Sequence, residues 1–540
     1  MSELKQIPEQ IDVGTRVANA LNNGKDVVII DAPTGWGKTG LAYQIYNQTG
    51  KRTLILNNNN VLVNQYIDLI ENNAPECVSC KGKNNYVCGR DSTMTPASSR
   101  CTKKSCPLTR MGKCEYYRRR ELMELKKLVI SNYQLIFSLL DAGAELSQYD
   151  LIICDECHNI ENIIVDYATV MMSIKICEDI DSYNSSVKRV KTLSKTDKDD
   201  LIEYAKELKQ TVLCTNAKNY IEKFNKFYSI IIKISEIVSG IGTKENDHGY
   251  NDYLDALLNK WSNFKGDSEK QNFLYDSEDR ELHKLVPLKI DKIFNRYMKQ
   301  VAPQIVLMSA TVINPNNMIN DFGFDKDKVE YIELESKFDK ANRPIVPLGV
   351  TKVKITDDNY ENSNEFKILI ETIINLLKTH SQLEQSGLIY CNSYKLCNMI
   401  YRNIQGKTDY KILMNTNASE TKKVLEEFLD TSVKKRLLIS PSFAEGVNFN
   451  DDISRFQIIP KVPYLYLGSN RIATKCRQNG RWYTNKTIEN IIQVAGRSVR
   501  SKTDEAVTYI LDSSFSWCYN QYKEDYPKWF DEAIVKGGDL

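Results

Sequence analysis

The sequence predicts an α/β protein with two parallel sheets, each covered by helices. Two observations support this fold class. Short β-branched runs alternate with helical stretches, which is typical of strands connected by helices. The first series is interrupted by a long insertion and then resumes, and a second series follows after a linker at 340–344, so the pattern predicts two separate sheets. A chain of 540 residues is long enough for three or four domains.

The first predicted sheet begins just before a glycine-bearing loop. The run 26–31, DVVIID, is a short β-branched segment that leads into this loop, and a helix is expected at 40–46. Further strands of the same sheet are expected at 53–56, 128–131, 151–154 and 305–308. Helical stretches separate these runs, so the sheet is expected to be mostly parallel with helices on both faces.

A long helical insertion interrupts the first sheet. From about residue 173 to 299 the sequence is charged and largely helical in pattern, and it predicts no strong strand. The segment 340–344, KANRP, is interpreted as a linker. A second α/β series follows, with strands expected at 387–391, 436–440, 456–459 and 507–511.

The composition is that of a soluble globular protein, with 42% hydrophobic and 26% charged residues. The net charge is only +2, so any nucleic-acid site must be a local patch. No apolar run approaches the ~18 residues of a membrane span, and the first ten residues lack a signal-peptide pattern. Fourteen cysteines without a secretion signal favour metal ligation over disulfides. We therefore expect a cytoplasmic protein, in a bacterial or virus-infected cell, with no membrane partner.

The loop at 32–39, APTGWGKT, has the features of a phosphate-binding loop. Backbone N–H groups at a helix N-terminus bind phosphate, and Gly35 and Gly37 allow the backbone to come close. Lys38 supplies a positive charge to the β- and γ-phosphates, and Thr39 offers a hydroxyl group to Mg²⁺. With its strand and helix flanks, the loop predicts a nucleotide site; a chance glycine loop is the alternative.

An acid pair, Asp155 and Glu156, follows the predicted strand at 151–154. A carboxylate at the end of a strand is suited to hold Mg²⁺, directly or through water, and Asp155 takes this role in our interpretation. Glu156 would polarise the attacking water. An exposed acidic turn is the alternative, but the loop and the acid pair occur in the order that a nucleotide-hydrolysing site requires. His158 is expected to couple the site to neighbouring motifs.

Three later segments fit the same kind of site: SAT at 309–311, EGVNF at 445–449 and QVAGRSVR at 493–500. The last is expected on a helix, where Arg497 and Arg500 would share a face. Their planar guanidinium groups could reach a γ-phosphate from the second domain. Two arginines at this spacing usually mark a solvated face, and the ordered set of motifs outweighs that alternative.

Four cysteines lie between the loop and the acid pair, with the spacing Cys88-x12-Cys101-x4-Cys106-x7-Cys114. Four thiolates are enough for a tetrahedral zinc ion or a 4Fe-4S cluster. Two alternatives remain open: a zinc site that uses the CxxC formed by Cys77 and Cys80, and a segment that binds no metal.

The segment around these cysteines is also basic. The stretch 77–127 holds 13 Lys or Arg against 4 Asp or Glu, with tyrosines among them, and this composition suits the binding of single-stranded nucleic acid.

In this order the motifs resemble those of superfamily 2 helicases, and more narrowly the XPD/DinG group of Rad3-like iron–sulfur DNA helicases. The segments that carry the narrower resemblance are KGKNNYVC at 81–88, SNY at 131–133, DECHN at 155–159, PSFAEGV at 441–447 and KVPY at 461–464. The chain departs from the group at Cys157, where alanine is usual, and at 57–60, where four asparagines replace a threonine-containing segment.

The resemblance implies two RecA-like motor domains, the first carrying an iron–sulfur insertion and a helical, arch-like insertion. The implied boundaries are 1–75, 119–165 and 286–338 for the three parts of helicase domain 1, 76–118 for the iron–sulfur domain, 166–285 for the arch-like insertion and 339–540 for helicase domain 2.

The resemblance also implies the site residues. The expected catalytic residues are Lys38, Asp155, Glu156, Gln493, Arg497 and Arg500. The expected ATP-binding residues are Gln10, which would read the adenine, Thr34, Gly35, Gly37, Lys38, Thr39, Glu445 and Gly446. Thr39 and Asp155 would hold Mg²⁺, and Cys88, Cys101, Cys106 and Cys114 would hold a 4Fe-4S cluster.

The implied function is that of an ATP-dependent DNA helicase that moves 5′ to 3′ on single-stranded DNA and unwinds forked duplex DNA. RNA–DNA hybrids are a further expected substrate. Two alternatives remain open: an ATP-driven translocase that remodels protein–DNA or RNA–DNA complexes, and a scaffold that binds ATP and DNA but does not need catalysis.

Overall fold

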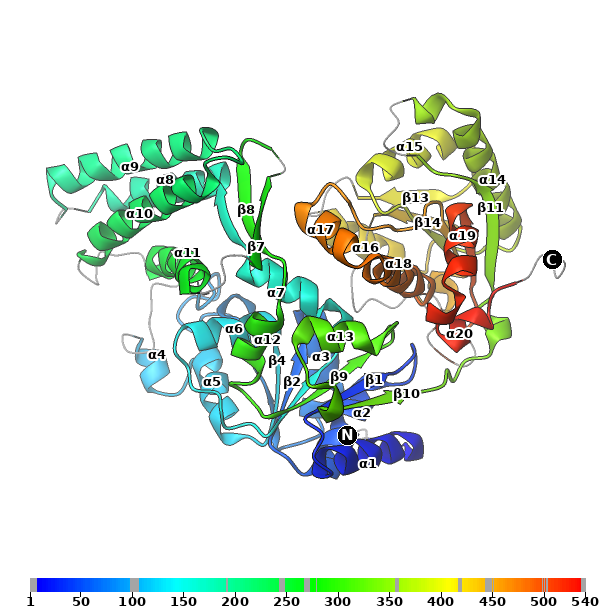
Figure 1. Cartoon of the computed structure of the whole chain (residues 1–540), viewed down its shortest axis with the longest axis horizontal. Helices are drawn as coiled ribbons and strands as arrows, with labels where there is room; N and C mark the ends of the chain where they lie inside the picture. The colour runs from blue at the N-terminus through cyan, green and yellow to red at the C-terminus, as the bar shows by residue number, and fades with distance from the viewer. Residues whose placement is uncertain are drawn as a thin grey trace.

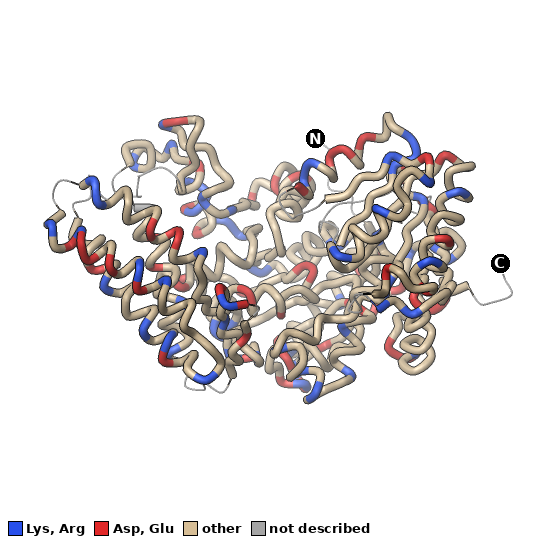
Figure 2. The backbone as a smooth tube through the Cα atoms, turned by 90° about the horizontal axis from the view of Figure 1, so that it is seen from above, with Lys and Arg blue, Asp and Glu red and all other residues tan. Residues whose placement is uncertain are grey.

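The computed structural model describes residues 7–97, 106–190, 193–241, 248–266, 272–277, 279–354, 359–415, 420–441, 449, 451–497, 499, 501 and 504–535. It contains two parallel sheets and a helical insertion between strands of the first (Figure 1). Acidic and basic residues are interspersed over both sheet domains and the insertion, in agreement with the small net charge (Figure 2).

The first sheet has the strand order β10-β1-β9-β5-β2-β4-β3, and all neighbouring strands are parallel. Its strands are β1 (Val27–Asp31), β2 (Thr53–Asn57), β3 (Cys77–Ser79), β4 (Leu128–Asn132), β5 (Leu151–Cys154), β9 (Gln304–Ser309) and β10 (Val329–Glu333). The five strands expected from sequence are confirmed. The sheet continues at β3 beyond residue 75, the predicted end of its first part.

Helices cover both faces of this sheet because its strands are apolar on both sides. Along β1, Val28 and Ile30 pack into one hydrophobic cluster, and Val27 and Ile29 pack into another on the opposite face. The helices of this domain are α1 (Pro8–Asn22), α2 (Lys38–Thr49), α3 (Asn60–Tyr66), α6 (Tyr133–Asp141), α7 (Ile160–Ala168), α12 (Asp291–Met298) and α13 (Pro315–Phe322).

The second sheet has the order β11-β16-β15-β12-β14-β13 and is also parallel. Its strands are β11 (Ile345–Thr351), β12 (Gly387–Tyr390), β13 (Lys411–Met414), β14 (Arg436–Ser440), β15 (Phe456–Ile459) and β16 (Val507–Asp512). Its helices are α14 (Asn364–Gln382), α15 (Tyr394–Ile404), α16 (Thr421–Leu429), α17 (Asn470–Gln478), α18 (Gly480–Ala495), α19 (Ser514–Gln521) and α20 (Lys528–Asp531). Two parallel-sheet domains, as predicted, therefore form the framework.

In its described residues the insertion holds the helices α8 (Ile174–Val187), α9 (Lys195–Leu213), α10 (Tyr220–Ser239) and α11 (His248–Gly266). It also holds a three-stranded antiparallel sheet of β6 (Val170–Ser173), β8 (Leu282–Pro287) and β7 (Phe273–Ser277), so the prediction of no strong strand in this region was wrong. The physical reason is that β6 pairs with β8 across the whole insertion, and each strand alone is too short to show a period.

The cysteine segment contains two short helices after β3. They are α4 (Pro107–Arg110) and α5 (Glu115–Leu125), and α5 continues past residue 118, the predicted end of that domain. None of the helices in the described parts of the chain has both the length and the apolar character of a membrane span.

Candidate functional site: a cavity between the two sheets

The glycine loop joins the end of β1 to the start of α2, as the sequence predicts. Gly35 and Gly37 both have φ of 79°, in the left-handed region, and Gly37 precedes the first residue of α2. A Cβ atom on Gly35 would lie only 1.8 Å from the ring of Phe338. Glycine is therefore required at position 35 for two reasons, the backbone conformation and the space.

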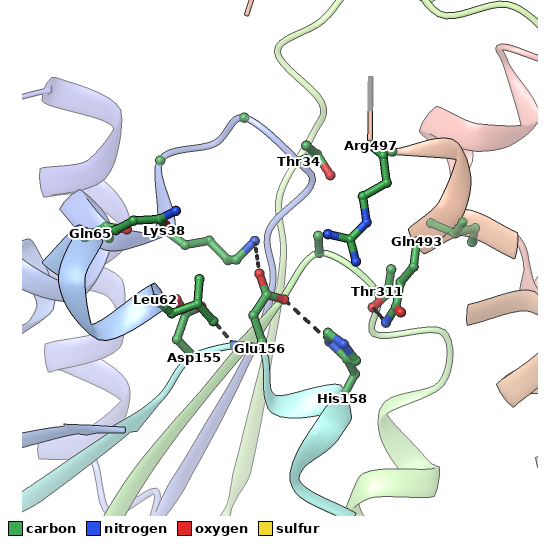
Figure 3. A pocket seen from close by; sticks show the side chains of 16 residues that line it. Thr34, Lys38, Leu62, Gln65, Asp155, Glu156, His158, Thr311, Gln493 and Arg497 are labelled. Carbon is green, nitrogen blue, oxygen red and sulfur yellow. Dashed lines mark hydrogen bonds and ion pairs between the residues drawn. The ribbon is translucent and has the colours of Figure 1, made fainter. Parts of the chain in front are cut away.

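A cavity of about 350 Å³ lies beside this loop, between the two domains (Figure 3). Domain 1 contributes Thr34, Gly35, Gly37, Lys38, Thr39, Leu62, Gln65, Asp155, Glu156, His158, Ala310 and Thr311, and domain 2 contributes Ile492, Gln493, Gly496 and Arg497. Nine of the residues predicted to bind ATP or catalyse its hydrolysis are in this lining. The fold thus brings together side chains that lie more than 450 positions apart in sequence.

Asp155 is the buried acid of the cavity, only 3% exposed. Its Oδ2 accepts a hydrogen bond from Tyr66 Oη at 2.9 Å, and its Oδ1 accepts one from the Glu156 amide at 2.9 Å. Burial, and then the charge of Glu156, raise the pKa of Asp155 to about 6. Mg²⁺ prefers carboxylate and hydroxyl oxygens, and Asp155 and Thr39 line the same cavity, so this donor set fits the ion.

Glu156 contacts two neighbours that bear on catalysis. Its Oε1 lies 3.2 Å from Lys38 Nζ, and its Oε2 lies 3.5 Å from His158 Nδ1 (Figure 3). Its backbone has φ of 48°, an uncommon left-handed conformation for a residue other than glycine. Burial lowers the pKa of His158 to about 4, so this imidazole is neutral at physiological pH.

A chain of hydrogen bonds runs from His158 to the second domain. His158 Nδ1 lies 2.8 Å from Ser309 Oγ, and Ser309 Oγ lies 3.2 Å from Thr311 Oγ1. Gln493 Nε2, on α18 of domain 2, donates to Thr311 Oγ1 at 3.4 Å. This arrangement agrees with the expectation that His158 couples the acid pair to neighbouring motifs.

Several predicted residues lie elsewhere. Gln10 does not line the cavity; its Nε2 donates to the carbonyl oxygens of Trp36, at 3.3 Å, and Gly37, at 3.0 Å. It therefore supports the loop backbone, and its contact with adenine stays a prediction. Arg500, Glu445 and Gly446 lie outside the described residues.

The expected helix over 493–500 is shorter than predicted, because α18 ends at Ala495. Arg497 therefore lies beyond the helix, from which it extends toward the cavity (Figure 3). Gly496 marks the change of direction, and a Cβ atom there would lie 3.1 Å from Thr34 Oγ1 across the domain boundary. The sequence could not show this close approach between domains.

The sequence did not identify three residues of α3 that lie at the site: Leu62 and Gln65 line the cavity, and Tyr66 contacts Asp155. No motif marks them. Tyr66 occupies a buried position on an ordinary apolar helix face, and only the packing of α3 beside β2 and β4 turns its hydroxyl group toward Asp155.

Comparison with known proteins places this site in a family. The model of the helicase C-terminal domain matches residues 376–533, and that of the type III restriction enzyme, res subunit, matches 3–190. The ATP-dependent DNA helicase CHL1 of Candida albicans is 22% identical over 78% of this chain and 59% of its own length. A probable ATP-dependent helicase of Methanocaldococcus jannaschii, MJ0942, is 21% identical over 93% of this chain and 90% of its own.

Two solved structures share the fold. One called XPD helicase has a TM-score of 0.65 and 16% identity, with 96% of this chain and 98% of that chain covered. The Xpd4 structure from S. tokodaii has a TM-score of 0.62 and 15% identity, with 98% and 99% covered. The family models, the relatives and the shared fold together support a superfamily 2 helicase of the XPD/Rad3-like type. The chain spans about three fifths of the length of the CHL1 relatives.

The shared fold confirms the two predicted RecA-like domains, and the family models and relatives agree with the predicted kind of helicase. The cysteine segment is described only in part. Cys88 and Cys106 are buried, Cys114 is half-buried directly before α5, and Cys101 lies outside the described residues. Within the described ranges, no group of three or more His, Cys, Asp or Glu side chains is arranged to hold a metal ion.

The rival zinc site at Cys77 and Cys80 does not fit the geometry. Cys77 packs into the hydrophobic cluster on one face of the first sheet, and Cys80 packs into the cluster on the other face. Burial raises the pKa of both thiols, to about 11 for Cys80. Two thiols on opposite faces, held in the neutral form, are poor partners for one metal ion.

Proposed function

We propose that the protein is an ATP-dependent DNA helicase that moves on single-stranded DNA. The observation that carries the proposal is the cavity formed by both motor domains, with a hydrogen-bond chain from His158 to Gln493 across it and Glu156 3.5 Å from His158. The names of the relatives, ATP-dependent DNA helicase CHL1 among them, support the same function.

The lining residues can perform ATP hydrolysis. Lys38 would leave Glu156 for the β- and γ-phosphates when ATP enters, and Glu156 would then be free to orient and polarise the attacking water. Thr39 and Asp155 would hold Mg²⁺, which neutralises charge on the phosphates. Arg497 lies on the opposite wall, where its guanidinium group can stabilise the charge that develops on the transferred phosphoryl group.

Hydrolysis in this cavity can drive movement because its walls belong to different domains. With phosphate bound, Lys38 and Arg497 are attracted to the same group and the domains are held closed. Loss of phosphate releases that attraction. Opening one base-pair step costs ~1.4 kcal/mol of free energy. A repeated cycle of domain closing and opening can supply this free energy at every step. Passive trapping of single strands cannot, because it stops once the binding sites are filled.

We further propose that movement is 5′ to 3′ and that forked duplex DNA and RNA–DNA hybrids are substrates. The test uses two duplexes that carry a single-stranded tail on only the 5′ or only the 3′ side. Strand separation is expected with ATP and the 5′ tail only. Separation with the 3′ tail only would contradict the polarity. Displacement of a DNA-bound protein without strand separation would favour the remodelling alternative.

We propose that Cys88, Cys101, Cys106 and Cys114 hold a 4Fe-4S cluster. Four thiolates are the donor set that such a cluster requires. Cys114 directly precedes α5. Within the described residues, Cys88 and Cys106 are buried, so a metal bound there would be shielded from water.

Anaerobically purified protein is expected to contain about four irons per chain and to show a broad visible absorption band. The variant Cys106→Ser is expected to lose both. The matched control is Cys214→Ser, because Cys214 is an exposed cysteine on the insertion and should leave the iron content unchanged. One zinc ion per chain without colour would overturn the iron–sulfur assignment but leave the ATP site intact.

A further inference from the structure

Glu161 lies at the boundary between the two motor domains and does not line the ATP cavity. It occupies the first turn of α7, close behind His158, and is only 4% exposed. Its Oε1 lies 2.6 Å from Arg471 Nη2 and 2.6 Å from Lys475 Nζ, and its Oε2 lies 3.9 Å from Lys486 Nζ. One buried carboxylate of domain 1 therefore holds three cations of domain 2.

The same cations make further contacts that fix α17 against domain 1. Arg471 and Lys475 are one turn apart on α17. Lys475 Nζ also lies 3.1 Å from Asp321 Oδ1 at the end of α13. Arg471 Nε donates to the Pro287 carbonyl oxygen at 2.8 Å, where β8 leaves the insertion. Helix α17 thus faces α7 and the base of the insertion (Figure 1).

The electrostatic balance depends on the charge of Glu161. Burial alone raises the pKa of Glu161, but Lys475, Lys486 and Arg471 lower it by more, so its pKa lies below the ordinary value. A neutral side chain at this position would leave buried cations without their common partner, and unpaired buried charges are strongly unfavourable. The two domains would then no longer be held at this point.

The contact continues to the ATP cavity through α18. Lys486, Glu489 and Gln493 follow each other at intervals of three and four residues, so they share one face of the helix. At one end of this face, Lys486 Nζ lies 3.2 Å from Glu489 Oε2 and 3.4 Å from the His158 carbonyl oxygen. At the other end, Gln493 donates to Thr311 in the cavity. A shift of Lys486 therefore shifts Gln493 as well.

We infer that Glu161 is a positioning residue for ATP hydrolysis. By binding Arg471, Lys475 and Lys486 it sets the position of α17 and α18, and so the place of Gln493 and Arg497 on the wall opposite the phosphates. The inference rests on the proposed ATP hydrolysis. It adds that the contact of Glu161 with the three cations keeps Gln493 and Arg497 of domain 2 in position.

The test compares Glu161→Gln with wild type. The kcat of DNA-stimulated ATP hydrolysis is expected to fall by about tenfold or more, because groups that act in the transition state are displaced. Binding of a fluorescent ATP analogue is expected to change by less than about twofold, because the glycine loop is untouched. The matched control is Glu426→Gln, which removes the exposed ion pair with Lys422 on α16 and should change neither quantity.

A double variant separates positioning from a general structural role. If Glu161 acts through α18, adding Glu161→Gln to Gln493→Ala should lower kcat by no more than about twofold beyond Gln493→Ala alone. If the decrease in kcat of the double variant equals the product of the decreases in the two single variants, the inference is overturned.

A second variant, Lys475→Met, removes one cation and leaves Glu161 paired with Arg471. It is therefore expected to fold and to lower kcat by a smaller factor than Glu161→Gln. An unchanged kcat in Lys475→Met would also count against the inference.

Hydrogen exchange gives a readout that does not depend on catalysis. Amides of α17 and α18 are expected to exchange faster in Glu161→Gln than in wild type, while those of α2 stay unchanged. A wild-type protein that does not hydrolyse ATP would refute the proposed function and leave this measurement valid. Unchanged exchange in α17 and α18 would refute the role of Glu161 alone.

Discussion

Replacing Glu156 with glutamine is expected to lower the kcat of ATP hydrolysis by about 10²–10⁴-fold, the usual contribution of a general base. Glutamine has the size of glutamate but cannot take up a proton from the attacking water. ATP binding should persist or tighten, because Lys38 loses its ion pair with Glu156, at 3.2 Å, and becomes free for the phosphates.

The measurement is steady-state ATP hydrolysis with single-stranded DNA, together with direct ATP binding. The control is Glu330→Gln. Glu330 is on β10, and the change removes its half-exposed ion pair with Lys25, at 4.0 Å, which lies three strands away from β5 and its acid pair. We expect wild-type rates from this control, since exposed ion pairs contribute little. A Glu156→Gln protein that kept more than about half of the wild-type kcat would exclude Glu156 as the base.

Replacing Gly35 with alanine is expected to weaken ATP binding by about 30-fold or more, equivalent to roughly 2 kcal/mol. Two costs combine at this position. The backbone has φ of 79°, which alanine adopts only with strain, and the new Cβ atom would lie 1.8 Å from the Phe338 ring. Either the loop or Phe338 must move, and the loop amides then no longer point at one phosphate position.

Gly24→Ala is the matched control for the strain alone. Gly24 has φ of 88°, close to that of Gly35, but a Cβ atom there would meet nothing within 4 Å. Both variants should lose about 1 kcal/mol of stability from backbone strain, and only Gly35→Ala should lose ATP binding. Equal ATP affinity in the two variants, measured by titration with a fluorescent ATP analogue, would show that the contact with Phe338 does not control the loop.

Local sequence determined the parts of this protein that depend on short segments. A β-branched run, a glycine loop and a helix are continuous in sequence, so the phosphate-binding loop at Gly35 to Lys38 could be located by its pattern. The acid pair after β5 was recognisable for the same reason. Five strands of the first sheet were also predictable, because buried parallel strands are continuous apolar runs.

Contacts between distant segments were not visible in sequence. The strand β6 pairs with β8 across the whole insertion, and Gly496 lies close to Thr34 in the other domain. Arg497 was predicted as a site residue, but its place beyond the end of α18 was not. A periodic pattern reports the environment of one element and carries no information about which element will lie opposite it.

The sequence by itself determined the resemblance to superfamily 2 helicases, the two parallel-sheet domains and the residue types of the candidate ATP site, because each of these depends on local order along the chain. Only the tertiary structure decided that Tyr66 binds Asp155, that Gln10 supports the loop rather than lining the cavity, and that Glu161 holds three cations of the other domain. The physical reason is that a buried charge or hydroxyl group is defined by its partners, and packing alone selects those partners.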